Sequence, residues 1–211
     1  MPREALDVID AGLALSQGVP ALLKAASTIA LEFDGHRALE YAQRLLQMVP
    51  DDRATQVELG NALLATGSAR EALRVAEALH LSDPTDGRAL AMQADALRML
   101  GAPHYRELLD YREFVRAETI DVPDGWPNLP LYLAELVRDL RRLHTLHAHP
   151  IGNSLRGGSQ IQLDPAQSPF ASIRAFPQAI DGPIRRYMQA LGTGSDPMRR
   201  RNAGGYRISG I

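Results

Sequence analysis

The stretch that decides the fold is residues 53–86, RATQVELGNALLATGSAREALRVAEALHLSDPTD. Its pattern repeats that of the residues before it, because a short polar turn follows Pro50 and another follows Pro84. We call the interval between these two prolines the repeat period. The same interval relates three further pairs of residues, which are Ala38 and Ala72, Ala42 and Ala76, and Leu45 and Leu79. A fixed period of about 34 residues that holds over several positions predicts repeated pairs of helices.

Each residue type in the pattern has a role in a pair of packed helices. Small residues let two antiparallel helices approach closely, and these are Gly60, Ala72 and Ala76. Leucines are expected to fill the seam between them, and these are Leu59, Leu63, Leu73 and Leu79. Gly67 permits the turn between the helices, and Pro84 closes the unit.

This spacing resembles that of the tetratricopeptide repeat. The predicted units are 19–52, 53–86 and 87–118, and the helical pattern of residues 1–18 is expected to cap the array. The third unit departs from the pattern after Gly101, where Arg106 stands in place of a small residue.

The second half of the chain changes character at a proline-rich segment. Residues 119–150 are interpreted as this boundary followed by an amphipathic linker helix over 128–147. Residues 168–190 are predicted to form two short helices divided at Asp181-Gly182-Pro183. The alternation in 205–211 predicts a strand that is only beginning, which suggests that the chain is truncated.

Several motifs in this half resemble one family. They are Asp110-Tyr111, Phe114-Val115-Arg116, Pro123-x-Gly125-Trp126, His149-Pro150, Asn153–Gln160, Asp181-x-Pro183-Ile184-x-x-Tyr187 and Tyr206-Arg-Ile-Ser-Gly. The likeness is to bacterial tetratricopeptide proteins fused to a 2-oxoglutarate/iron(II) oxygenase domain. Gln160-Ile161 departs from it, because such proteins more usually carry Gln-Thr there.

The resemblance implies a mainly α fold: a tetratricopeptide-repeat α-solenoid, a helical linker, and then the start of a β-domain, an incomplete double-stranded β-helix. Residues 151–211 would be the N-terminal portion of an oxygenase-like domain. Iron(II) and 2-oxoglutarate are implied for a full-length protein, with the iron ligands beyond Ile211.

The sequence itself contains no His-x-Asp or His-x-Glu, and no histidine follows His149. The usual iron ligand set is therefore missing, so neither iron(II) nor 2-oxoglutarate is expected to bind this chain. No catalytic residue is predicted, and the chain is expected to be inert.

The loop Asn153–Gln160 supplies three candidate ligand contacts, which are Ser154, Arg156 and Gln160. Arg156 could clamp a carboxylate through two parallel hydrogen bonds. The alternative is structural: the glycine pair permits a tight turn, and Arg156 pairs with a local acid.

Two other clusters have a chemical and an ordinary interpretation. The histidines His144, His147 and His149 are either metal ligands or the polar end of a helix, and we favour the helix end. The arginines Arg185, Arg186 and Arg199–Arg201 either contact an anionic partner or form a solvated surface, and we favour the surface.

The repeats are expected to bind a protein or peptide. Candidate contacts are the polar residues Gln56, Asn61, Gln93 and Arg98. The leading hypothesis is the N-terminal part of an oxygenase whose repeats bind a partner or substrate. The alternative is an adaptor without enzymatic activity.

Composition limits the other classes of function. The net charge of −2 argues against a nucleic-acid-binding protein, and the absence of cysteine excludes disulfides and thiolate metal sites. Without a long run of consecutive apolar residues or a basic leader, the sequence predicts a cytoplasmic protein with no membrane partner.

Overall fold

The computed structural model describes residues 2–16, 18–144, 161 and 163–208, and they are mainly helical. The prediction of a mainly α protein is confirmed. The chain divides into two compact units, Met1–Asp110 and Tyr111–Ile211. Each is described by itself.

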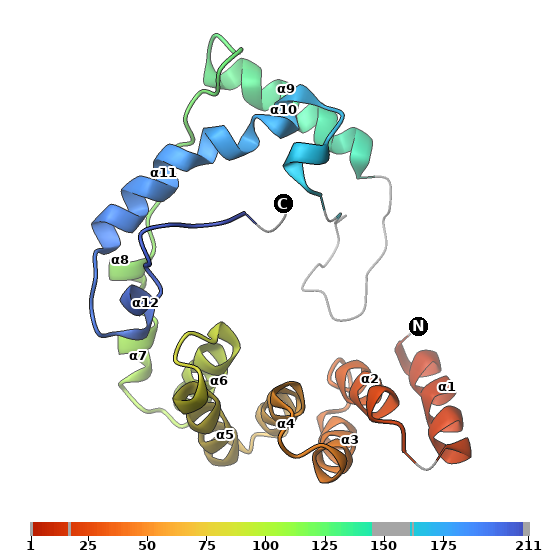
Figure 1. Cartoon of the computed structure of the whole chain (residues 1–211). Coiled ribbons are helices and arrows are strands. Elements are labelled where there is room, and N and C mark those ends of the chain that lie inside the picture. The colour runs from red at the N-terminus through yellow and green to blue at the C-terminus, as the bar shows by residue number, and fades with distance from the viewer. Residues whose placement is uncertain (1, 17, 145–160, 162, 209–211) are drawn as a thin grey trace. The chain divides into compact units, whose positions relative to one another are not determined.

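The first unit is a series of helices in which each helix packs against the next. The helices are α1 (Pro2–Leu15), α2 (Pro20–Ala30), α3 (Gly35–Met48), α4 (Arg53–Ala65), α5 (Ala69–Ser82), α6 (Gly87–Met99) and α7 (Tyr105–Leu108). Beyond these neighbours, α2 contacts α4 and α4 contacts α6. Helices α2, α4 and α6 therefore form one row, and α3 and α5 lie in a second row (Figure 1).

The repeat period recurs in the bounds and turns of these helices. The starts of α3 and α5 are one period apart, and so are the starts of α4 and α6. Gly67 and Gly101, also one period apart, both have positive φ angles, of 79° and 67°. Gly67 therefore has the left-handed conformation that its predicted role in the turn requires.

Equivalent aspartates cap two helices of the first row, α4 and α6. The Asp52 carboxylate accepts the backbone N–H of Thr55 at 2.8 Å, and the Asp86 carboxylate accepts that of Arg88 at 2.8 Å. Asp86 also accepts Arg53 Nε at 2.9 Å, which joins the starts of α4 and α6. Burial raises the pKa of Asp86, but the bonds from Arg88 and Arg53 outweigh it and hold the pKa well below its usual range.

This low pKa predicts a loss of stability in acid. The pKa of an aspartate in the unfolded chain is about 3.9. The stabilisation that Asp86 provides is therefore complete above that pH and disappears as the pH falls through its lower pKa in the folded protein. We expect the melting temperature to fall between about pH 4 and pH 2, and to fall less in Asp86→Asn. Parallel curves for the two proteins would contradict this role.

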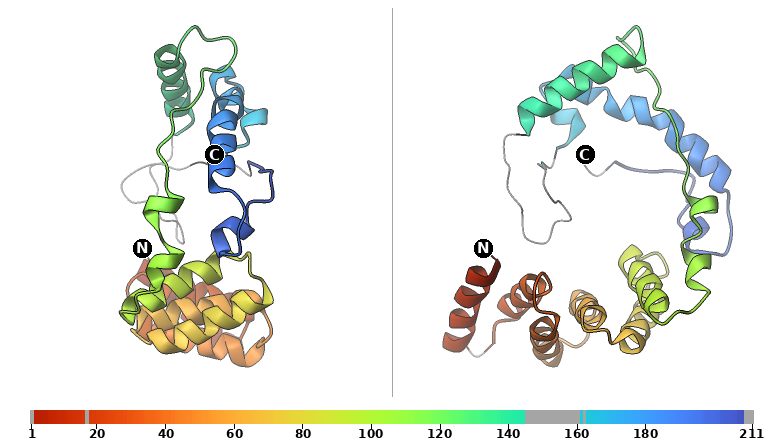
Figure 2. Two further views of the ribbon diagram at one scale, coloured as in Figure 1. Left: turned by 90° about the vertical axis from the view of Figure 1, so that its left-hand side faces the viewer. Right: turned by 180° about the vertical axis from the view of Figure 1, so that it is seen from behind.

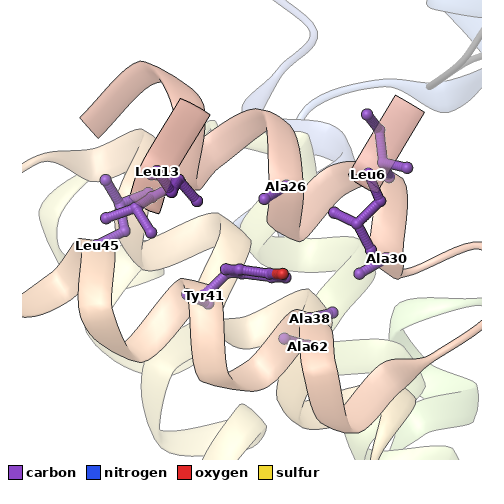
Figure 3. Close-up of a cluster of buried hydrophobic side chains, with 11 residues drawn as sticks. Leu6, Leu13, Ala26, Ala30, Ala38, Tyr41, Leu45 and Ala62 are labelled. Carbon is purple, nitrogen blue, oxygen red and sulfur yellow. The ribbon is translucent and has the colours of Figure 1, made fainter. Parts of the chain in front are cut away.

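The core of the N-terminal end is formed mainly by α1, α2 and α3, with Ala62 contributed by α4. Leu6 and Leu13 from α1 meet Ala26 and Ala30 of α2 and Tyr41 of α3, as Figure 3 shows. A polar contact joins the same helices, because Asp10 accepts hydrogen bonds from Arg37 and from the Tyr41 hydroxyl. Helix α1 thus packs on the array through both apolar and polar contacts.

Two glycines of this unit predict opposite effects of the same substitution. A Cβ on Gly35 would lie 3.0 Å from the Ala65 carbonyl oxygen, whereas one on Gly12, inside α1, would lie 3.6 Å from Leu22. We expect Gly35→Ala to lower the free energy of unfolding by about 1–3 kcal/mol. Gly12→Ala should raise it by about 0.5–1 kcal/mol, since alanine favours helix. Urea titration of both variants checks the signs, and stabilisation by Gly35→Ala would contradict the close approach.

The third pair of helices is incomplete. Helix α6 is followed by α7, which spans Tyr105–Leu108 and whose described side chains are all exposed or half-buried. The first unit ends at Asp110, whereas the predicted repeats extended to residue 118.

The second unit is built around the contact between two of its helices. Its elements are α8 (Tyr111–Phe114), α9 (Leu129–Leu143), the 3-10 helix η1 (Pro165–Gln167), α10 (Ala171–Arg174), α11 (Phe176–Leu191) and α12 (Pro197–Arg200). Helix α10 packs against α9, as both views in Figure 2 show. Helix α9 corresponds to the linker helix predicted over 128–147. The last three residues of that prediction, 145–147, lie outside the described residues.

A buried polar network joins α9 to α10. The Tyr132 hydroxyl, fully buried, donates to the Ser172 carbonyl oxygen at 3.1 Å. The Ser172 hydroxyl in turn donates to Asp139 at 2.8 Å. The hydrogen bond from Arg138 lowers the pKa of Asp139 most, and the bond from Ser172 lowers it further, so the pKa lies below its usual range. This carboxylate therefore stays charged although its side chain is only 2% exposed.

The predicted break at Asp181-Gly182-Pro183 is wrong, because α11 continues through it. Pro183 has no N–H to donate to the carbonyl of Ala179, four residues earlier. The backbone N–H of Asp121 takes that place and donates to Ala179 at 2.8 Å. A donor from a distant segment thus satisfies the carbonyl that the proline leaves unpaired.

The predicted strand over 205–211 has no counterpart among residues 205–208, which have no regular structure, while 209–211 lie outside the described residues. No β-strand is assigned in the described part of the chain. The β-domain therefore stays a prediction.

Candidate partner-binding face

The row of α2, α4 and α6 exposes one polar face, which we call the open face. It is defined by Lys24 and Thr28 of α2, Glu58 and Asn61 of α4, and Asp95 and Arg98 of α6. All six residues belong to the first unit.

Helix α4 shows why one stripe stays open. Its exposed or half-buried residues Ala54, Glu58, Asn61 and Ala65 are spaced four, three and four apart, which places them on one side of a helix. The other sides carry the residues that pack against neighbouring helices. Thr55, Val57, Gly60, Ala62 and Leu63 are buried there.

Helix α6 repeats this arrangement. Asp95, which lies one repeat period after Asn61, is exposed, and so are Ala91 and Arg98 beside it. Met92 is buried on the side toward α4, where a Cβ on Gly60 would lie 2.2 Å from its sulfur. The missing side chain at Gly60 thus lets α6 approach α4 closely.

The contribution of α2 follows from a contact across the row. The Thr28 hydroxyl donates to Glu58 Oε2 at 3.3 Å, which joins α2 to α4 on the open face. Lys24, one turn before Thr28, is exposed. Burial raises the pKa of Glu58, and the Thr28 bond and the charge of Lys24 oppose that rise.

The open face carries charges of both signs. Arg98 pairs with Asp95 at 3.2 Å, and both side chains are more than half exposed. Asn61 lies on α4, between the Asp95–Arg98 pair of α6 and Lys24 of α2. Its amide offers donors and an acceptor, which is the combination that a peptide backbone requires.

The structure separates the four residues predicted to contact a partner. Asn61 and Arg98 lie on the open face. Gln56 lies on another side of α4, where its amide donates to the Pro50 carbonyl at 3.1 Å, and Gln93 is half-buried on another side of α6. Sequence reasoning missed Lys24, Thr28, Glu58 and Asp95. The spacing of three or four residues from Asn61 was a signal that could have found Glu58.

The predicted ligand-contact residues Ser154, Arg156 and Gln160 lie outside the described residues, as do His147 and His149. His144 follows α9, and its backbone N–H donates to the Leu140 carbonyl at 3.0 Å. Among the residues that the structure describes, no three histidines or carboxylates gather in a way that could hold a metal ion.

Several arginines of the basic cluster are engaged in ion pairs. Arg185 pairs with Asp181 at 2.8 Å, and Arg186 pairs with Glu118 at 3.2 Å. Arg199 contacts both Asp196 and Glu113. Much of the positive charge of this cluster is therefore balanced locally.

No family model matches the sequence of this chain, and no curated protein matches it. Within the described ranges, no helix combines the length and apolar character needed to cross a membrane.

Proposed function

We propose that the first unit is a tetratricopeptide-type helical array that binds an extended segment of a protein partner on its open face. The observation that carries the proposal is the open face itself. Three helices of one row expose polar and charged side chains along one side, while their remaining sides are packed against other helices.

Two features of the packing support the repeat interpretation. The helix starts, the capping aspartates and the left-handed glycines all recur after one repeat period. In the row that carries the open face, α2 also contacts α4, and α4 also contacts α6. Stacked helical pairs present an extended surface of this kind to their partners.

The test is a selection of binding peptides from a random display library, followed by charge reversal. Arg98→Glu changes the open face, and Arg70→Glu makes the same change on the exposed side of α5 in the second row. We expect Arg98→Glu to lower the affinity for the selected peptides about tenfold or more, and Arg70→Glu to leave that affinity unchanged. Equal effects of the two variants would contradict the proposal.

A second candidate function is favoured by one contact in the second unit. Two of the motifs that resemble the oxygenase family meet there, because the Tyr206 hydroxyl donates to Asp181 at 2.7 Å. On this proposal the second unit accompanies an iron(II)/2-oxoglutarate oxygenase domain, and the repeats recruit its substrate. The residues of this chain do not fit the iron, since the sequence lacks the His-x-Asp or His-x-Glu pair.

An anaerobic titration with iron(II) and 2-oxoglutarate tests this second candidate on two proteins. We expect the 211-residue chain to give no saturable absorbance change, and the protein expressed from its complete reading frame to give one. No signal from the complete product would reject the oxygenase and leave an adaptor. A signal from the shorter chain would contradict the missing ligand set.

A further inference from the structure

A cleft of about 420 Å³ lies in the second unit between η1, α11 and the segment that follows α12. Pro177, Asp181 and Arg185 line it from one side of α11, since they are spaced four residues apart. Asp164 lines it beside η1, and Tyr206 lines it from the returning chain, whose course is visible in Figure 1.

One arginine in this cleft is oriented by a carboxylate. Asp181 accepts Arg185 Nε through both of its oxygens, at 2.8 and 3.0 Å, and it accepts the Tyr206 hydroxyl at 2.7 Å. Within the described residues, no acceptor is bonded to the two terminal nitrogens of Arg185. That end of a guanidinium can hold a carboxylate through two parallel hydrogen bonds.

The second charged group is Asp164. Its Oδ1 atom accepts the backbone N–H of Ala166 at 3.0 Å, while Oδ2 has no donor among the described residues. Because Arg185 balances Asp181, Asp164 leaves the lining with one uncompensated negative charge. A ligand with only a carboxylate would meet this charge unfavourably, whereas a ligand that also carries an ammonium group would be attracted by it.

The remaining lining is suited to an aliphatic group. Pro165, Pro177 and Ile208 present apolar surface to the same cleft. We propose that this cleft binds a small zwitterionic amino acid with an aliphatic side chain. Arg185 holds its carboxylate, Asp164 accepts its ammonium group, and the side chain packs on the apolar wall.

Calorimetry with three matched probes tests the proposal on the intact chain. The probes are L-leucine, 3-methylbutylamine, which lacks the carboxylate, and 4-methylpentanoate, which lacks the ammonium group. We expect L-leucine to bind about tenfold more tightly than either analogue, because each lost charge-assisted bond costs roughly that factor.

Variants assign each charge to its partner. Arg185→Gln should weaken the binding of L-leucine and 4-methylpentanoate. It should not weaken the binding of 3-methylbutylamine, because the substitution leaves Asp181 without its cation and makes the lining more negative. Asp164→Asn should weaken the binding of L-leucine and 3-methylbutylamine. Asparagine is chosen because its side-chain oxygen can still accept the Ala166 N–H. Arg186→Gln is the matched control, because this neighbouring arginine pairs with Glu118 and does not line the cleft.

The fluorescence of Trp126, the single tryptophan, confirms that each variant of this unit remains folded. No saturable binding of L-leucine to the wild type, or equal affinity for all three probes, would overturn the proposal. So would an effect of Arg186→Gln equal to that of Arg185→Gln.

Discussion

Tyr132→Ala is expected to lower the free energy of unfolding of the second unit by about 3–5 kcal/mol. Tyr132 is fully buried in the cluster that joins α9 to α10 and α11, together with Leu136, Ile173 and Ala179. Its removal leaves a cavity and also deprives the Ser172 carbonyl of its donor.

The effect can be measured through Trp126, whose ring centre lies 5.1 Å from that of Tyr132 in an edge-to-face contact. Tyr132→Phe is the matched control, since it keeps the ring and loses only the hydroxyl. It should cost about 1 kcal/mol in the same fluorescence-detected urea titration. If the alanine variant unfolds at the wild-type urea concentration, the network between α9 and α10 does not hold this unit together.

Leu79→Ala is expected to lower the free energy of unfolding of the first unit by about 2–4 kcal/mol. Leu79 is 1% exposed and packs with Val57, Ala76 and Met92, which lie on α4, α5 and α6. One truncation therefore loosens three helices of the array.

Leu81, two residues later on the same helix, provides the control because it is 85% exposed. Leu81→Ala should change the free energy of unfolding by no more than about 0.5 kcal/mol. Circular dichroism at the helix band during urea titration measures both variants. Equal losses would show that the burial pattern of α5 is wrong, and with it the assigned register of the repeats.

The sequence was most informative where one residue type at one position has a single physical consequence. Gly67 is expected to permit the turn between two helices, and its positive φ is the left-handed conformation that glycine adopts without strain. Gly60 is expected to let the two antiparallel helices of its unit approach closely, and a Cβ there would lie 3.4 Å from Val75 of α5. The tighter contact is with Met92 of α6, which the prediction did not include. Helices α4 and α5 lie within residues 53–86, the interval that the repeat period delimits.

The first repeat shows where a strict period misleads. The turn between α2 and α3, Leu31–Asp34, is one residue longer than the turn between α4 and α5, Thr66–Ser68. One period before Asn61 lies Ser27, yet Ser27 is buried and donates to the Ala38 carbonyl. The half-buried Thr28 lies on the open face instead, and it is not one period before Asn61 or Glu58, so spacing alone could not find it.

The second unit could be predicted less well because its contacts join distant segments. Whether α11 breaks at Pro183 depends on Asp121, which lies outside that helix and supplies the missing donor. The pairing of Tyr206 with Asp181 is equally remote in sequence. No local pattern encodes either contact.

The most direct test of partner binding is site-specific cross-linking. The photoreactive residue p-benzoylphenylalanine replaces Asn61 on the open face in one protein and Gln43, exposed on α3 in the second row, in another. A peptide selected on the wild-type protein is then added and irradiated. The proposed function predicts covalent capture of the peptide from position 61 and not from position 43. Capture from position 43, with none from position 61, would contradict it.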